Sequence, residues 1–69
     1  MSKLYSSRDI IRVLQKKGFF YVSQRGSHAK FEKNKLIVIV PSPKKEIPYG
    51  TFKSILRQSN LTEGDFKKG

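Results

Sequence analysis

Three runs of β-type residues, separated by very short turns, limit this chain to a small number of folds. FFYVSQR at 19–25 is aromatic and β-branched, SHAKFEK at 27–33 alternates with period two, and LIVIV at 36–40 is continuously apolar. The turns at 25–27 and 33–35 are too short for a crossover to a parallel strand, which needs about a dozen residues. We therefore predict a three-stranded antiparallel meander whose third strand is buried on both sides, or nearly so.

A helical pattern precedes the strands. Ser6 and Asp9 have capping-box spacing with Asp in place of Glu, and Gly18 suits a left-handed helix stop. Between these signals runs an apolar stripe formed by Ile10, Ile11, Val13 and Leu14. We predict a helix over 6–18 that packs this stripe against the sheet.

A second helix is predicted after the strands. Pro41 and Pro43 end the third strand because neither can donate to a β-ladder, and SPKKE follows as a polar loop. The helix should begin between residues 48 and 51 and end near Ser59. Its sheet-facing residues are expected to be Phe52, Ile55 and Leu56.

The remaining residues add little to this framework. Residues 61–69 are expected to form at most one frayed turn, with Thr62 as its cap and Phe66 as its anchor. The predicted class is α+β: one two-layer domain over residues 1–69, order α-β-β-β-α, with both helices on one face of the sheet. The opposite face of the sheet stays open to solvent, and function is expected there. Double-stranded RNA-binding domains share this element order, an analogy of fold that favours RNA as the partner.

Charge is the strongest compositional constraint on function. Fifteen Lys and Arg residues against five Asp and Glu give a formal charge of +10. This excess favours a polyanionic partner, first nucleic acid, then an acidic protein, and last an anionic membrane surface. The chain has no cysteine and one histidine, so we expect no disulfide, metal site or cofactor. The longest apolar run is far short of a membrane span, which favours a soluble, cytoplasmic protein.

The single histidine, His28, lies between a turn signal and a group of cations. Alternation along the second strand places His28 and Lys30 on one face and Phe31, a core residue, on the other. His28 is therefore expected on the open face, beside the turn at Arg25 and Gly26. An ordinary surface histidine is the simplest interpretation, but the flexible turn, the cations and the overall charge favour a functional one.

Imidazole suits acid–base chemistry on RNA, because it titrates near pH 6.5 and the ribose 2′-hydroxyl supplies the nucleophile. His28 would take the proton from that hydroxyl or give one to the leaving oxygen. Arg25, Lys30 or the backbone amides around Gly26 and Ser27 would stabilise charge on the phosphate, and no metal is needed.

Other residues offer weaker candidate contacts to RNA. Lys44 and Lys45 follow the third strand beside the open sheet, and they either contact phosphates or belong to a solvated loop. Tyr5, Tyr21 and Tyr49 could stack on bases, but aromatic residues at such positions are more often core. We count the two lysines as candidate RNA contacts and expect the three tyrosines in the core.

Four segments in this order and spacing resemble a known family. They are KKGF at 16–19, GSHAKF at 26–31, VPSPKKEI at 40–47 and GTFKSILRQSNL at 50–61. Nearly the whole chain resembles the HicA toxins of bacterial and archaeal toxin-antitoxin pairs. The resemblance implies a double-stranded RNA-binding-domain-like fold, mRNA interferase activity that stops translation, and inhibition by a HicB antitoxin. It also implies that His28 is the catalytic histidine and that Gly26 and Ser27 form the turn that presents it.

The resemblance is incomplete at one place, and other functions stay open. Many members carry a further histidine where this chain has Ser42 and Pro43, so His28 would act with cations alone. The alternatives are an RNA-binding module without catalysis, in which His28 contacts phosphate or ribose, and a DNA-binding or ribosome-associated protein. An acidic HicB-like antitoxin is expected to cover His28, because it would then neutralise the charge and block the site together.

Overall fold

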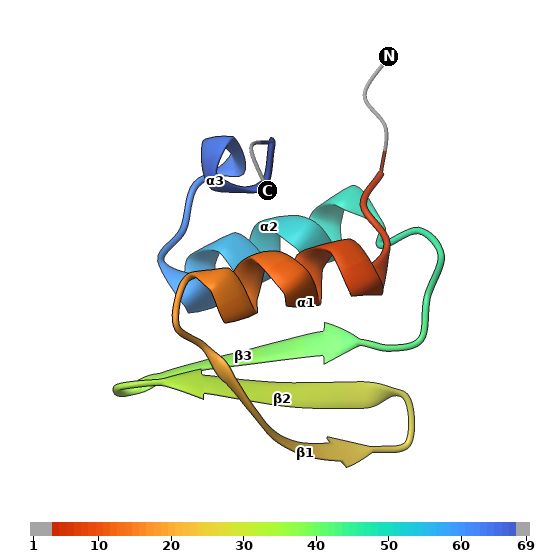
Figure 1. Ribbon diagram of the computed structural model, residues 1–69. Helices are drawn as coiled ribbons and strands as arrows, with labels where there is room; N and C mark the ends of the chain where they lie inside the picture. The colour runs from red at the N-terminus through yellow and green to blue at the C-terminus, as the bar shows by residue number, and fades with distance from the viewer. Residues whose placement is uncertain (1–3, 68–69) are drawn as a thin grey trace.

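The chain folds as two helices on a three-stranded sheet, followed by a short third helix (Figure 1). The computed structural model describes residues 4–67. In chain order the elements are α1 (Ser7–Lys16), β1 (Phe20–Arg25), β2 (His28–Lys33), β3 (Leu36–Pro41), α2 (Tyr49–Ser59) and α3 (Glu63–Lys67). The main helices and the strands thus lie close to their predicted bounds.

The strands form the predicted antiparallel meander, with the spatial order β1-β2-β3. Gly26 lies in the first turn with φ 55°, and Asn34 lies in the second with the same value. These are the two residue types that adopt the left-handed conformation most readily. The chain can therefore reverse within two residues at each end of β2.

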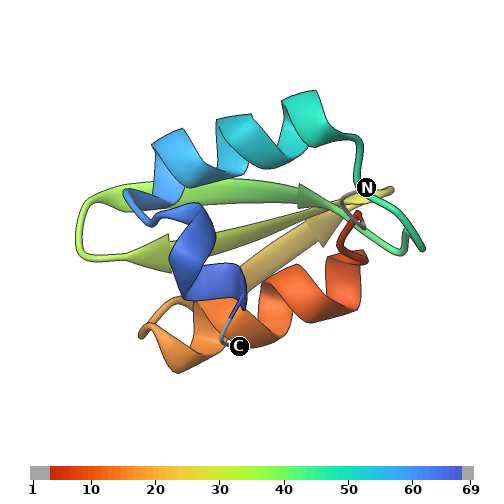
Figure 2. The ribbon, with the colours of Figure 1, turned by 90° about the horizontal axis from the view of Figure 1, so that it is seen from above.

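The helices cover one face of the sheet only. Ala29 and Phe31 of β2 and Val38 and Val40 of β3 are buried, and α1 and α2 lie side by side over that face (Figure 2). His28, at an alternate position of β2, is exposed on the other face. The predicted α+β class, with order α-β-β-β-α and both helices on one face, is confirmed, and it fits a double-stranded RNA-binding-domain-like description.

The third strand differs from its prediction. Val38 and Val40 are fully buried, but Ile37 is 47% exposed and Ile39 is partly exposed. The expectation of burial on both sides was wrong, because α1 and α2 both pack on the same face and leave the opposite face of the sheet uncovered. A continuous apolar run therefore does not distinguish a strand buried on two faces from one buried on a single face.

A β-bulge decides which side chains of β1 share the open face. Pairing with β2 shifts between Tyr21 and Ser23, so Val22 is an extra residue in β1. After the bulge, Ser23 pairs with Lys30, and Arg25 pairs with His28. Because paired residues project to the same side, the bulge brings Arg25 to the face that carries His28.

Local signals stand at both ends of α1 and at the end of α2, and those of α1 are the predicted ones. The Ser6 hydroxyl accepts the N–H of Asp9 at 3.1 Å, which caps the start of α1. Gly18, with φ 98°, turns the chain out of α1. Asn60 does the same after α2 with φ 62°. Local sequence chemistry therefore sets both ends of α1 and the end of α2.

The segment between β3 and α2 is packed more tightly than its polar composition indicated. Ile47 is fully buried, and its N–H donates to the carbonyl of Tyr5 at 2.7 Å. It belongs to a core formed by Ile10, Val13, Leu14, Phe19, Ala29, Phe31, Val38, Val40, Ile47, Phe52, Ile55 and Phe66. The predicted polar loop is thus followed directly by an apolar residue, Ile47, that anchors this segment against the N-terminal segment.

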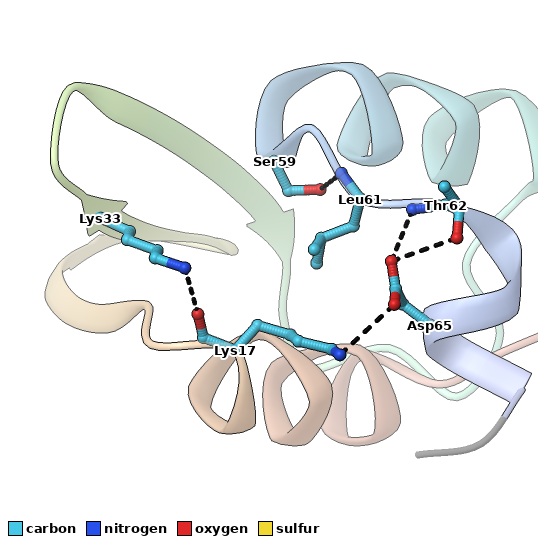
Figure 3. A network of polar contacts seen from close by, with 6 residues as sticks. All are labelled: Lys17, Lys33, Ser59, Leu61, Thr62 and Asp65. Atoms are coloured by element: carbon cyan, nitrogen blue, oxygen red, sulfur yellow. Dashed lines mark hydrogen bonds and ion pairs between the residues drawn. The ribbon is translucent and has the colours of Figure 1, made fainter.

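The short helix α3 is fixed by one buried ring and one carboxylate. Phe66 is buried against Phe52, with ring centroids 5.1 Å apart, which confirms it as the anchor. Thr62 does not cap as expected, because its N–H and its hydroxyl both donate to the Asp65 carboxylate, at 2.9 and 3.1 Å. Lys17 adds an ion pair to Asp65 at 3.3 Å and so joins α3 to the end of α1 (Figure 3).

The burial of alternate residues in β3 predicts unequal effects of neighbouring substitutions. Val38→Ala should lower the free energy of unfolding by about 2 kcal/mol, through lost transfer energy and the cavity left behind. Ile37→Ala, which removes more atoms but from the exposed face, should cost less than about 1 kcal/mol. Urea unfolding of both variants measures the difference, and equal losses would contradict a sheet covered on one face.

The Asp65 contacts predict a pH-dependent stability. The hydrogen bond from the Thr62 N–H is the main cause that lowers the pKa of Asp65, and Lys17 contributes to the lowering. Because the pKa of Asp65 is lowered in the folded state, its ionised carboxylate stabilises the protein above the unfolded-state pKa of about 3.9. This stabilisation is lost as the pH falls through the folded-state pKa. Asp65→Asn should therefore lower the melting temperature at neutral pH.

The stability difference between wild type and Asp65→Asn should shrink as the pH is lowered below about 4. Glu46→Gln, which removes an exposed acid from the loop before α2, is the matched control. Thermal melts followed by circular dichroism across this pH range provide the measurement. A gap between wild type and Asp65→Asn that is constant with pH would show that the Asp65 charge is not responsible.

Candidate functional site

The open face of the sheet has a basic end and an apolar end. Three cross-strand rows make up this face: Arg25, His28 and Pro41; Ser23, Lys30 and Ile39; and Phe20, Glu32 and Ile37. We call Arg25, His28 and Lys30 the basic end. Phe20, which is 58% exposed, and Ile37 form the apolar end.

His28 stands at the start of β2, directly after the Gly26–Ser27 turn. It lines a shallow hollow together with Ser23, Arg25, Lys30 and Ile39. The residues of that lining that carry a permanent charge, Arg25 and Lys30, are both cations, which favours an anion in the hollow. The structure thus places His28 on the predicted face and brings it together with Arg25 and Lys30.

Lys30 is shared between this hollow and Glu32. Its ammonium lies 3.8 Å from the Glu32 carboxylate, and both side chains are more than 30% exposed. Exposed ion pairs of this kind contribute at most about 1 kcal/mol. A phosphate in the hollow can therefore compete with Glu32 for Lys30.

The turn that presents His28 is braced by the residue after β3. The N–H of Ser42 donates to the carbonyl of Ser27 at 2.7 Å. The Gln24 side-chain amide donates to the carbonyls of Gly26, at 3.1 Å, and Ser42, at 2.9 Å. These bonds hold the turn against the chain beyond β3. The backbone of Gly26 and Ser27, directly before His28, is therefore fixed in position.

Sequence reasoning missed Gln24 and Ser42 as structural parts of the site. The resemblance to HicA toxins draws attention to Ser42 and Pro43 only because many of those toxins carry a further histidine there. It follows Pro41, the cross-strand partner of His28, so a histidine at position 42 would lie beside the same turn. The spacing of this chain gives no local signal for the brace, because Gln24 and Ser42 are 18 residues apart.

Lys44 and Lys45 are exposed but do not lie on the open face. They line a different hollow with Ser6, Ser7, Arg8 and Pro43, at the start of α1. Figure 1 shows the β1–β2 turn, the segment after β3 and the start of α1 at the same end of the molecule. The predicted basic residues therefore form two groups at one end, rather than a single cluster around His28.

Two of the three tyrosines expected in the core are exposed. Tyr21 lies on an edge strand, where its ring meets the buried Phe31 edge-on at 5.9 Å. Tyr49 donates its hydroxyl to Glu63 at 2.6 Å, and this bond, with smaller effects of burial and of the Glu63 charge, raises the pKa of Tyr49. Tyr5 alone packs on the core. None of the three shares the open face with His28.

Two absences concern the described part of the chain, residues 4–67. No group of three or more histidine, aspartate or glutamate side chains there could hold a metal ion. Within the same residues, no helix combines the length and the apolar character that crossing a membrane requires.

Comparison with known proteins identifies the family. The model of the family described as "HicA toxin of bacterial toxin-antitoxin" matches residues 7–61, which include every strand, both main helices and His28. A comparison with curated proteins gives no match. The family match spans most of the chain, and this protein therefore belongs to the HicA toxin family of bacterial toxin-antitoxin systems.

Proposed function

We propose that this toxin is an endoribonuclease that cleaves mRNA in the cytoplasm and so inhibits translation. The observation that carries this proposal is the position of the only histidine, His28, which is exposed in a hollow with Arg25 and Lys30. A nucleic acid chain can reach this surface without entering a closed cavity. The charge of +10 favours such a polyanionic substrate.

In the proposed reaction, His28 moves one proton at the scissile phosphate. The ribose 2′-oxygen attacks phosphorus and the bond to the 5′-oxygen of the next nucleotide breaks, which gives a 2′,3′-cyclic phosphate and a 5′-hydroxyl. His28 either removes the proton of the 2′-hydroxyl or supplies one to the departing oxygen, and water makes the other proton transfer. Arg25 and Lys30, with backbone amides of Gly26 and Ser27, would stabilise the additional negative charge on the phosphate. These steps use no metal ion.

A second function deserves a direct test, because the open hollow and the cations would equally suit binding alone. In that case the protein is a basic RNA-binding module and His28 contacts a phosphate or a ribose. Salt dependence does not separate the two functions, since both neutralise phosphates. Only the nuclease breaks the chain, and only the mechanism through the 2′-hydroxyl requires ribose at the cut site.

The antitoxin is proposed to bind over the basic end of the open face. A toxin of this family has a cognate antitoxin, and an acidic surface would match Arg25, His28 and Lys30. Complementary charge speeds the encounter and fixes the orientation of the partners. One contact would then neutralise the cations and exclude RNA from His28.

Replacing His28 should separate cleavage from folding. His28→Ala should reduce the rate of RNA cleavage by about 100- to 10,000-fold, the usual contribution of a general acid or base. Its stability should change by no more than about 0.5 kcal/mol, because the side chain is exposed. Single-turnover cleavage of labelled RNA gives the rate, and thermal melts give the stability.

Two controls define this experiment. Ile37→Ala, at the apolar end of the same face, should keep cleavage near the wild-type rate. An RNA with a single deoxyribose at the mapped cut site should remain intact at that position. Wild-type protein that binds RNA but never breaks it would identify the protein as a binding module, and cleavage by His28→Ala at the wild-type rate would remove His28 from the mechanism.

Antitoxin binding should shield His28 from chemical modification. Diethyl pyrocarbonate should modify His28 in the free toxin and leave it largely unmodified in the complex, as measured by mass spectrometry of its peptide. The lysine Lys53, exposed on α2, provides a control for general protection when an amine-reactive reagent is used. Equal modification of His28 in the free and the bound toxin would place the antitoxin elsewhere.

A further inference from the structure

A second group of cations lies at the start of α1, away from the open face. Arg8, Lys44 and Lys45 are exposed and line one hollow with Ser6, Ser7 and Pro43. All titratable residues of that lining are cations. We call Arg8, Lys44 and Lys45 the α1 cluster.

Ser7 holds the two parts of the α1 cluster together. Its backbone N–H donates to the carbonyl of Lys44 at 2.9 Å. Its hydroxyl accepts the N–H of Lys44 at 2.9 Å and donates to the carbonyl of Lys44 at 3.2 Å. Ser7 is only 4% exposed, so these bonds are partly shielded from water. The backbone of Lys44 is thereby fixed beside α1, next to Arg8.

Ser42 links the turn before His28 to the surroundings of the α1 cluster. Ser42 donates its N–H to Ser27 in the turn before His28. Ser42 and Pro43 also line a hollow with Arg8 and residues of α1 that include Arg12. The residues that brace the His28 turn therefore border the hollow that leads to Arg8.

The separation of the two groups suits one extended strand of nucleic acid. His28 pairs with Pro41 across the sheet, and antiparallel partners have Cα atoms about 5 Å apart. Three further residues lead to Lys44, each adding at most about 3.8 Å. The Cα atoms of His28 and Lys44 are thus within about 17 Å, a distance that a few nucleotides can cover.

The acidic residues near the α1 cluster do not neutralise its positive charge. Asp9 pairs with Arg12 at 3.4 Å rather than with Arg8. Glu46 is exposed and follows Lys45 in the chain. With Arg12 included, four cations therefore stand against two neighbouring acids, Asp9 and Glu46, an excess that attracts phosphate groups.

We propose that Arg8, Lys44 and Lys45 form a second phosphate-binding site, which holds the RNA strand on one side of the cleavage site. This inference rests on the proposed function, in which RNA is the substrate at His28. It adds Arg8 as an RNA contact and assigns Ser7 as the residue that positions Lys44. The cluster binds backbone phosphates and does not touch the reacting atoms.

The test uses a protein that binds RNA without cutting it. In the His28→Ala background, Arg8→Gln should weaken binding of a fluorescently labelled single-stranded RNA several-fold. Loss of one phosphate contact should also make the slope of log affinity against log salt shallower by about 0.7. Fluorescence anisotropy over a series of salt concentrations measures both quantities, and circular dichroism confirms that each variant is folded.

Arg57→Gln in the same background is the matched control. Arg57 is an exposed arginine in the last turn of α2, at the end of that helix far from the β1–β2 turn (Figure 1). It should leave the affinity and the salt slope close to those of His28→Ala. In the protein that retains His28, Arg8→Gln should raise the KM for RNA cleavage and leave kcat nearly unchanged. The contact of Arg8 with an RNA phosphate is the same in the bound substrate and in the transition state.

Each other outcome overturns a distinct statement. Unchanged RNA binding by Arg8→Gln, together with cleavage that depends on His28, would refute the second site and leave the proposed nuclease intact. If Arg57→Gln weakened RNA binding as much as Arg8→Gln, the loss of affinity would come from the lower net charge alone, and the second site would also be refuted. Weaker antitoxin binding with unchanged RNA binding would make the α1 cluster a protein interface. Absence of both RNA binding and cleavage in the wild type would refute the proposed function itself.

Discussion

Burial of a single face of the sheet is the constraint on which the rest of this structure depends. Phe31 and Val38 project toward the helices, and the period of two along each strand then sends His28 and Ile37 to the other side. Among residues 4–67, no helix covers that second face. The same alternation that builds the core therefore leaves an open surface for function.

The loop between β3 and α2 fixes one end of the molecule at three points. Ser42 binds the β1–β2 turn, Lys44 binds Ser7, and Ile47 binds Tyr5 and fills the core. Each contact joins segments that are distant in the sequence. Since the loop is held in this way, His28 and the basic residues keep a defined spacing although none of them lies within a deep cavity.

The fold was largely predictable because its signals are local. Ser6, Gly18 and the glycine turn at 26 act within a few residues, and the alternation along β2 gave the correct face for His28. The single-sided burial of β3 was not predictable, because an apolar run does not report what lies above it. The hydrogen bond between Gln24 and Ser42 and that between Ser7 and Lys44 were not predictable either, because they join residues that are 18 and 37 positions apart in the sequence.

The bulge at Val22 has a consequence for how copies of this protein behave in a crowded solution. At the far edge, one backbone N–H of β3 is already bonded, because the side chain of Gln58 in α2 accepts the N–H of Ile39 at 2.9 Å. At the near edge, β1 is exposed along its length and carries Phe20, Tyr21 and Val22 in succession. A straight apolar edge invites another strand to add to it. The bulge twists this edge and interrupts its ladder, which discourages neighbouring molecules from joining their sheets into aggregates.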